Sequence, residues 1–577
     1  MKTNHFKKII SVLVMVGLIT ISCKDNFLDV PATGSLANAQ LATKAGVEGV
    51  LIGAYSELTA RGYSRFAAPN NWVFGSIMGG ESNKGTDPGD YTPINPVQRY
   101  EADPTNGDIN SAWNAKYEGV ARANAVLRLL TQAQGIADAD KKRIAGEARF
   151  LRGHYYFDLK KIWNSVPYID ETVDYGTGIE KVKNTPALWD KIEADFKFAF
   201  DNLPETSAQA GRANKWAAGA YLAKAYLFQK KWAEAETLFD NVIANGKTTN
   251  GKKYGLVKSF SQIYNAANDN HEESVFAVQT AMNTGNVNNS NWFDDLNYPY
   301  NTGPNGPGNC CGFNQPSFDA ANSFRTKDGL PLLDGSFNTG SNALKHDFGV
   351  ETSAAFTPDA DPVDPRLDHS IGRRGIQYLD WQKHPGKDWI RAQPYAGPYS
   401  PKKYIYYKSQ ENTLTDGSSW TRGYATMNYT IIRFADVLLM AAEAKIEQGK
   451  LEPARVLINQ VRSRASDPTT WVKHGSENAA NYVIKTYDGP WNDKTFATNA
   501  LRMERKLELH HEGHRFFDLV RWGVAATVLN AYLANESKLL VTKFGGATFK
   551  AGKEYLPIPQ TQIDIQGKDI LTQNPSY

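Results

Sequence analysis

The densest group of potentially reactive side chains in this sequence lies near position 510. His510, His511, Glu512 and His514 fall within five positions, and imidazole and carboxylate groups are the usual ligands of protein-bound zinc. The HExxH motif of zinc enzymes nevertheless fails, because Arg515 stands where the second histidine should be. We therefore predict no metal ion at this place.

The same stretch favours a structural role. Gly513 is expected to end or kink the helix on which His510 and His514 would have to share a face. The neighbouring acids and arginines can instead pair with one another inside the protein. The predicted ion-pair network consists of Glu508, Glu512, Arg515, Asp518 and Arg521.

Two of the three cysteines are adjacent, at Cys310 and Cys311. Adjacent cysteines can join only through a tight turn, since ordinary disulfides need their Cα atoms farther apart. Gly308 and Gly312 flank the pair and permit such a turn. A vicinal disulfide that forms a rigid sulfur ledge beside a ligand and a pair of free buried thiols both remain open.

Aromatic side chains on predicted loops are the candidate ligand-binding residues. Tryptophan and tyrosine faces stack on flat apolar surfaces, while nearby amides, acids and arginines satisfy polar edges. No phosphate-binding loop, nucleophile motif or cofactor fingerprint occurs, so we predict no catalytic residue and no cofactor. The predicted ligand-binding residues are Trp72, Trp292, Tyr298, Tyr300, Trp381, Trp389 and Tyr395.

Carboxylates are plentiful but do not form an evident catalytic pair. A glycosidase needs two of them about 5 to 10 Å apart across the bond to be cleaved. The acids of the loop-rich segment, such as Asp380 and Asp388, show no local spacing that implies this arrangement. Glu81, on an earlier loop, is expected to be a solvated acid. Whether the 265–273 loop binds calcium stays open, since its acids and amides lack EF-hand spacing.

The charge balance excludes one class of partner. The chain carries 64 Lys and Arg against 61 Asp and Glu, and Lys2, Lys7 and Lys8 precede Cys23. Without that leader the charges balance, so the chain lacks the excess of cations that nucleic-acid binding requires.

The N-terminus has the layout of a secretory leader. A basic start is followed by an apolar run over 9–21, which is shorter than the about 20 residues that span a bilayer. A serine and Cys23 follow directly, as in bacterial lipoprotein signals. We predict a signal peptide over 1–22, lipidation of Cys23 and a tether over 23–36.

The rest of the chain is predicted to be mainly α-helical with one large irregular insertion. Apolar spacing places a helical scaffold over 37–246 and again over 431–577. The segment 247–430 lacks long helical periods, is rich in Asn, Gly and Pro, and contains a few candidate strands. Within the scaffold, long helices are expected near 37–58, 110–133, 139–163 and 185–203.

Two helix pairs have tetratricopeptide-like spacing. In each, a small residue is followed after 12 positions by a second small residue, and after 4 more by a large one. Small residues allow two helices to approach while the large one fills the groove. The two sets are Ala223, Ala235 and Phe239, and Ala442, Ala454 and Ile458; Lys445 makes the second match weaker.

Several stretches together carry a family likeness that extends along the mature chain. They are Phe27–Asp29 behind the lipoprotein-like start, Glu147–Leu159, Ile432–Ala444, Glu504–Trp522, and the tail segments Tyr555–Gln560 and Gln573–Tyr577. In these stretches the sequence resembles the SusD/RagB family of outer-membrane nutrient-binding lipoproteins of Bacteroidetes. The resemblance implies a helical scaffold with tetratricopeptide-like pairs and a ligand-binding insertion.

The resemblance also implies a function. It suggests a lipid-anchored protein on the cell surface that binds an oligosaccharide and delivers it to a SusC-like TonB-dependent outer-membrane transporter. Pyranose rings would stack on the loop aromatics, and no reaction would occur. The alternatives are a RagB-like peptide-uptake protein, an extracellular glycosidase using acids such as Asp380 or Asp388, and a pure interaction scaffold.

Overall fold

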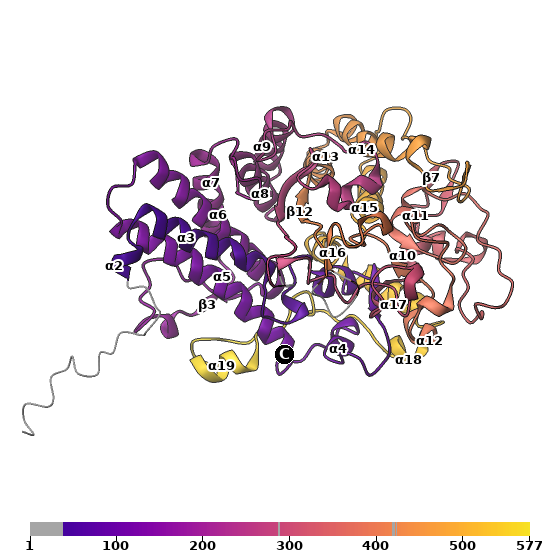
Figure 1. The fold of residues 1–577 in the computed structure, drawn as a ribbon, viewed down its shortest axis with the longest axis horizontal. Helices are drawn as coiled ribbons and strands as arrows, with labels where there is room; N and C mark the ends of the chain where they lie inside the picture. The colour runs from indigo at the N-terminus through magenta and orange to yellow at the C-terminus, as the bar shows by residue number, and fades with distance from the viewer. Residues whose placement is uncertain (1–37, 287–288, 418–421, 423) are drawn as a thin grey trace, which may run out of the picture.

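The computed structural model of the chain describes residues 38–286, 289–417, 422 and 424–577. The predicted leader, Cys23 and the tether lie outside the described residues. N-terminal helices occupy one side of the molecule, and the irregular segments lie on the other side with most of the C-terminal helices (Figure 1). Among the described residues, no helix is both long and apolar enough to cross a bilayer. The described residues form many helices and only short strands, which confirms the mainly helical fold class.

The N-terminal scaffold is built from consecutive helices that pack on one another. Asn106 and Asn214 begin two of them by accepting hydrogen bonds from the free backbone amides of the first turn. Three of the four long helices expected in this part are present with small shifts at their ends. The one expected over 37–58 is divided in two, because Thr43 accepts a hydrogen bond from the amide of Gly46 and begins a new helix there. The helices are α2 (Asn38–Leu41), α3 (Lys44–Ser56), α4 (Ile94–Gln98), α5 (Gly107–Gln132), α6 (Asp138–Trp163), α7 (Trp189–Asn202), α8 (Lys215–Phe228) and α9 (Trp232–Asn245).

The C-terminal scaffold begins with a second helix pair and ends beside the first scaffold. In Figure 1 the yellow helix α19 lies near α5, and Gln562 of α19 donates to Asn110 and Asn114 of α5. The C-terminal tail therefore packs against the N-terminal half of the chain. The helices are α13 (Phe434–Glu447), α14 (Leu451–Ala465), α15 (Lys494–Glu508), α16 (Arg515–Arg521), α17 (Ala525–Glu536), α18 (Val541–Phe544) and α19 (Gln560–Gln566).

The two tetratricopeptide-like pairs are α8 with α9 and α13 with α14, and α13 also packs against α9. All six residues of the predicted spacing are fully buried. Lys445, which weakened the second match, lies at the junction of the pairs and contacts Glu236 at 3.0 Å and Asp240 at 2.7 Å. The irregular residue of the repeat therefore joins the two copies.

The insertion leaves the scaffold and returns to it at one place. Its first strand, β4 (Ser274–Val278), pairs antiparallel with β12 (Tyr429–Arg433) at its end. Between them, the described residues form short two-stranded ladders and single-turn helices. The strands of the insertion are β5 (Phe313–Pro316), which pairs with β1 (Ser82–Gly85), β6 (Thr326–Lys327), β7 (Leu330–Pro331), β8 (Ile371–Gly372), β9 (Ser400–Pro401), β10 (Thr415–Asp416) and β11 (Tyr424–Ala425). Its helices are α10 (Phe318–Asn322), α11 (Arg366–Ser370) and α12 (Gln393–Ala396). Four further strands lie outside the insertion, namely β2 (Val166–Pro167), β3 (Asn184–Thr185), β13 (Lys473–His474) and β14 (Glu477–Asn478).

A cluster of buried ion pairs joins the insertion to the C-terminal helices. Arg433 binds Glu273 at 2.7 Å, Glu508 at 2.6 Å and Glu512 at 2.7 Å, and all four side chains are at most 1% exposed. Such charges are stable inside a protein only when they are paired and hydrogen-bonded. We call this set the buried charge cluster; it comprises Glu273, Asp364, Arg366, Lys403, Arg433, Arg462, Arg464, Glu504, Glu508 and Glu512.

Pairing decides the ionisation of the acids in this cluster. Burial alone would raise the pKa of Glu508, but the guanidinium groups of Arg464, Arg433 and Arg366 outweigh it and hold the pKa well below its usual range. Glu512 has its pKa lowered to about 2, since Arg433 and Lys403 outweigh its burial. Both acids are therefore charged at neutral pH.

The network predicted around position 510 is confirmed in most of its members. Glu508 and Glu512 belong to the buried charge cluster, and Asp518 pairs with Arg505 at 2.9 Å and with Arg521 at 2.8 Å. The prediction for Arg515 is wrong, since its guanidinium makes no ion pair with any described residue.

α15 ends at Glu508, so His510 already lies outside the helix and the helix ends earlier than Gly513 led us to expect. Gly513 lies in the turn before α16, at a positive φ of 71°. His510 and His511 stack on each other with ring centroids 4.1 Å apart. Within the described ranges, no group of three or more His, Cys, Asp or Glu side chains is arranged to hold a metal ion.

Candidate ligand-binding surface

Strands β1 and β5 bring two distant loops together. Gly85 is paired with Phe313, and the next backbone amide, of Thr86, donates to the carbonyl of Gly312 at 2.6 Å. A Cβ atom on Gly85 would lie 2.1 Å from that carbonyl oxygen, so the close approach requires glycine there. The loop after β1 therefore lies beside the turn that precedes β5, which contains both cysteines.

Cys310 and Cys311 form a disulfide in this turn. Cys310 is partly exposed, whereas Cys311 is 6% exposed. Bridges between Tyr298 and Cys311 and between Tyr300 and Asn309 hold a second extended segment beside the turn. Of the two alternatives that the sequence left open, the structure has the vicinal disulfide.

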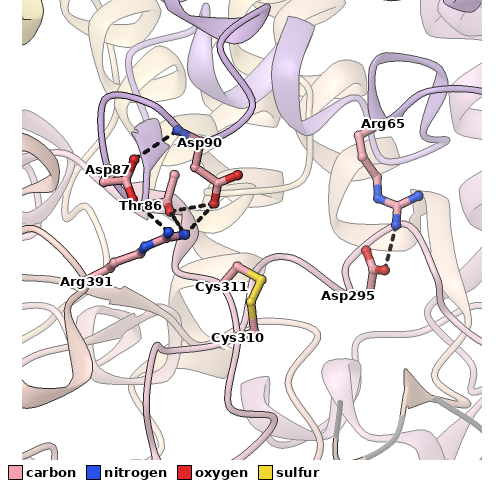
Figure 2. Close-up of a disulfide and its surroundings, with 8 residues drawn as sticks. All are labelled: Arg65, Thr86, Asp87, Asp90, Asp295, Cys310, Cys311 and Arg391. Carbon is pink, nitrogen blue, oxygen red and sulfur yellow. Dashed lines mark hydrogen bonds and ion pairs between the residues drawn. A yellow bond between two sulfur atoms is a disulfide. The ribbon is translucent and has the colours of Figure 1, made fainter. Parts of the chain in front are cut away.

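A partly exposed group of charges lies next to the disulfide. Figure 2 shows its position. Arg391 pairs with Asp87 at 2.8 Å and Asp90 at 2.5 Å, and these three side chains are 29–33% exposed. Arg391 also donates to the Thr86 hydroxyl at 3.0 Å, and its guanidinium carbon lies 5.4 Å from the centre of the Tyr300 ring. We call Thr86, Asp87, Asp90, Tyr300, Cys310 and Arg391 the disulfide surface.

A second pair lies on the other side of the disulfide in Figure 2. Arg65 binds Asp295 at 2.6 Å and covers the Trp292 ring with its guanidinium carbon 4.4 Å from the ring centre. Asp295 is fully buried, while Arg65 is 22% exposed. Arginine on an aromatic face and against a carboxylate is held in one orientation, with part of its fork free for solvent or a ligand.

The structure buries six of the seven predicted ligand-binding aromatics. Tyr300 is partly exposed and belongs to the disulfide surface. The others are 1–8% exposed and lie beneath the loops, at Trp72, Trp292, Tyr298, Trp381, Trp389 and Tyr395.

The buried rings act as a core for the irregular loops. Trp72 meets Phe313 edge to face, Trp389 meets Tyr378 in the same way, and the Trp381 indole donates to the Tyr406 carbonyl at 3.2 Å. Loops without regular backbone pairing need large rings to bury enough apolar area. For these six residues, the expectation of an exposed stacking face is therefore not met.

The charged residues of the disulfide surface were missed by the sequence analysis. Asp87 begins an Asp-Pro-Gly-Asp turn, and its side chain accepts hydrogen bonds from the amides of Gly89 and Asp90. This Asp-Pro-Gly-Asp turn motif is the sequence feature from which Asp87 could have been identified. Arg391 carries no comparable signal, because it reaches Asp90 across 301 positions.

Three other acids singled out in the sequence have structural surroundings, whereas the Asp388 side chain is exposed. Asp380 accepts hydrogen bonds from the backbone amides of Lys408 and Ser409. Glu273, at the end of the calcium-candidate loop, is paired with Arg433 and Arg464. Glu81 is 1% exposed rather than solvated, and burial raises its pKa to about 8. The expectation for Glu81 is therefore corrected.

Two protein families match this chain. A family described as "SusD family" matches residues 272–577, and one described as "Starch-binding associating with outer membrane" matches residues 26–227. A SusD-like protein of Bacteroides ovatus is 24% identical, with 98% of this chain and 94% of the relative covered. The starch-binding protein SusD of Bacteroides thetaiotaomicron is also 24% identical, over 78% of this chain and 75% of its own.

A solved structure shares the fold. Surface glycan-binding protein A from Bacteroides thetaiotaomicron, in complex with laminarihexaose, superimposes with a TM-score of 0.63. It is 19% identical, and 92% of this chain and 99% of that chain are covered. The first family match alone spans more than half of the residues, so the chain belongs to the SusD family.

Proposed function

We propose that the protein binds an oligosaccharide at the disulfide surface and carries out no reaction on it. The observation that carries this proposal is the partly exposed network of Arg391, Asp87 and Asp90 beside the Tyr300 ring and the disulfide. Charged donors and acceptors bind pairs of sugar hydroxyls, and a ring with adjacent sulfur offers an apolar face to the C–H side of a pyranose.

The relatives indicate which sugars to test first. One related protein is named for binding starch, and one of similar fold was solved with laminarihexaose. Both ligands are glucose polymers that differ in linkage. Glucans of both linkages are therefore the first ligands to examine for this chain.

We further propose that the protein is anchored at the outer membrane and passes its ligand to a SusC-like TonB-dependent transporter. The predicted lipidation of Cys23 supports the anchor, because more than one acyl chain gives stable membrane attachment. The family match described as associating with the outer membrane agrees with that location. Copurification of a barrel transporter with the tagged chain from its own membranes would test the partner.

Isothermal titration calorimetry tests the binding proposal. The chain from Asp25 on, which retains every described residue, is titrated with malto- and laminari-oligosaccharides, other glycans and short peptides. Saturable heat with a glycan supports the proposal. Heat that continues after each injection would indicate turnover and a glycosidase, and saturable heat with peptides alone would favour peptide uptake.

A matched pair of variants locates the site. Arg391→Gln removes the centre of the disulfide surface, whereas Arg455→Gln removes a similar arginine that pairs with Glu452 on α14. The proposal requires that glycan affinity falls in the first variant and stays unchanged in the second. Equal affinity in both would place the glycan elsewhere.

A further inference from the structure

A pocket of about 380 Å³ lies among the C-terminal helices. Its walls come from α15, α16 and α17 and from the turn at Ser336–Asn338. None of the residues of the disulfide surface lines it. A pocket of this size falls in the range that holds small organic ligands.

Most of the pocket wall is apolar. Several of its hydrophobic side chains are partly exposed. Such a wall favours an apolar ligand body and disfavours a polyol, whose hydroxyls would find no partners there. The apolar lining residues are Leu333, Met503, Leu519, Trp522, Val524 and Val528.

Two arginines of the wall are free to bind an anion. The guanidinium groups of Arg502 and Arg515 make no hydrogen bond or ion pair with any described residue, and the Nε atom of each is buried without a partner. Arg502 is held over the Trp522 ring, 5.1 Å from its centre. A buried donor without a partner is costly, so a carboxylate at this place would stabilise both the donor and the ligand.

The acid within the wall is already engaged. Asp319 binds Lys506 at 2.6 Å and accepts a hydrogen bond from Asn338 at 2.7 Å. The lining residues therefore carry two positive charges in excess, those of Arg502 and Arg515. Burial also lowers the pKa of both guanidinium groups, and the charges of Glu443 near Arg502 and of Glu81 near Arg515 only partly offset this effect.

We propose that this pocket is a second ligand site, which takes a small molecule with a carboxylate and an apolar aryl or acyl body. The carboxylate binds Arg502 and Arg515, and the apolar body lies against Met503, Trp522 and Val528. The site is independent of the glycan surface, because the two share no residue.

Titration of the chain from Asp25 on with 4-phenylbutanoate and with 4-phenylbutanamide tests this site. We expect saturable binding of the carboxylate and binding of the amide that is at least about tenfold weaker, since the amide lacks the charge. Arg502→Gln and Arg515→Gln should each weaken binding of the carboxylate by about tenfold. Lys538→Gln, which removes an exposed cation just beyond α17, should leave the affinity unchanged.

A filling variant keeps the test decisive if an arginine variant does not fold. Ala531 is exposed at the pocket rim, so Ala531→Trp should block the cavity without disturbing the core. It should abolish binding of 4-phenylbutanoate and leave the melting temperature and glycan binding unchanged. Equal affinity for carboxylate and amide, binding that survives Ala531→Trp, or no saturable binding of the carboxylate would each overturn the proposal.

Discussion

The buried charge cluster and the disulfide surface use the same residue types in opposite surroundings. In the cluster, Arg433 and its three glutamates are at most 1% exposed. At the disulfide surface, Arg391, Asp87 and Asp90 are each about one third exposed. The first set joins the insertion to the helices. The second set lies where the loop after β1 meets the insertion.

The difference shows how burial assigns roles to chemically equal groups. A buried charge cannot exchange its partner for water, so its loss leaves the remaining charges unpaired. A partly exposed ion pair, such as Arg391 with Asp87 or Asp90, contributes little to stability because water can replace either partner. It can therefore exchange that partner for a ligand hydroxyl. Four predictions test this contrast, in order of expected size.

The largest effect is expected from Arg433→Gln. This change leaves Glu273, Glu508 and Glu512 close together without the guanidinium that joins them, which should lower the free energy of unfolding by about 3–5 kcal/mol. Urea denaturation followed by circular dichroism measures it. Arg391→Gln is the matched control and should change stability by less than about 1 kcal/mol. Similar losses in both variants would break the comparison.

The second prediction concerns Glu81, which is buried but makes no ion pair with any described residue. It therefore tests how burial without pairing affects stability. Burial raises its pKa to about 8, whereas an unfolded glutamate titrates near 4.3. Between these values the folded chain holds the extra proton, so stability falls as the pH rises. Glu81→Gln removes this contribution and should flatten the dependence by on the order of 2–4 kcal/mol between pH 5 and pH 8.

Denaturation curves at several pH values measure that slope. Glu101→Gln, which alters an exposed acid paired with Arg99, should leave the slope as it is. Glu512 has the opposite sign, because its pKa is lowered to about 2 and its stabilisation disappears as the pH falls toward that value. An unchanged slope in Glu81→Gln would mean that the carboxyl is ionised in the folded protein.

The third effect concerns affinity rather than stability. Arg391→Gln should weaken glycan binding by about tenfold, which corresponds to about 1.4 kcal/mol, while the fold is retained. Calorimetry with the glycan that binds the unaltered chain provides the measurement. A loss of stability without a loss of glycan affinity would mean that Arg391 supports the fold and does not contact the glycan.

The smallest effect is expected from replacing both cysteines, as Cys310→Ser with Cys311→Ser. The bridge closes no loop between distant residues, so its removal should change stability by less than about 1 kcal/mol. Because Cys310 is partly exposed next to Tyr300, a twofold to fivefold loss of glycan affinity, about 0.4–1 kcal/mol, is expected. Equal glycan affinity in the unaltered chain and the double serine variant would mean that the disulfide does not contribute to glycan binding.

The helical part of the fold was predictable because its information is local. The 12-and-4 spacing that ends at Phe239 and Ile458 identified both helix pairs, and helical period located α5, α6 and α7 within a few residues. Gly513 indicated a break between α15 and α16, since glycine favours the positive φ found there, but α15 already ends at Glu508.

The site was predictable only in part. The adjacent cysteines and Tyr300 were identified from the sequence, because their residue types carry a chemical meaning at one position. Arg391 and Asp87 were not, because their roles arise from a contact between segments about 300 positions apart. Trp72 and Trp389 were assigned to ligand binding, but the structure places both in the core.

The sequence by itself determined the helices, the paired repeats, the irregular character of the insertion and the motifs shared with the SusD family. The tertiary structure alone decided which charges are buried, which aromatic rings are exposed, and which arginines, such as Arg515, make no ion pair with a described residue. In a helix, the spacing of the apolar residues shows which face packs against the rest of the protein. An irregular loop has no such period, so the exposure of each side chain depends on segments far away in the chain.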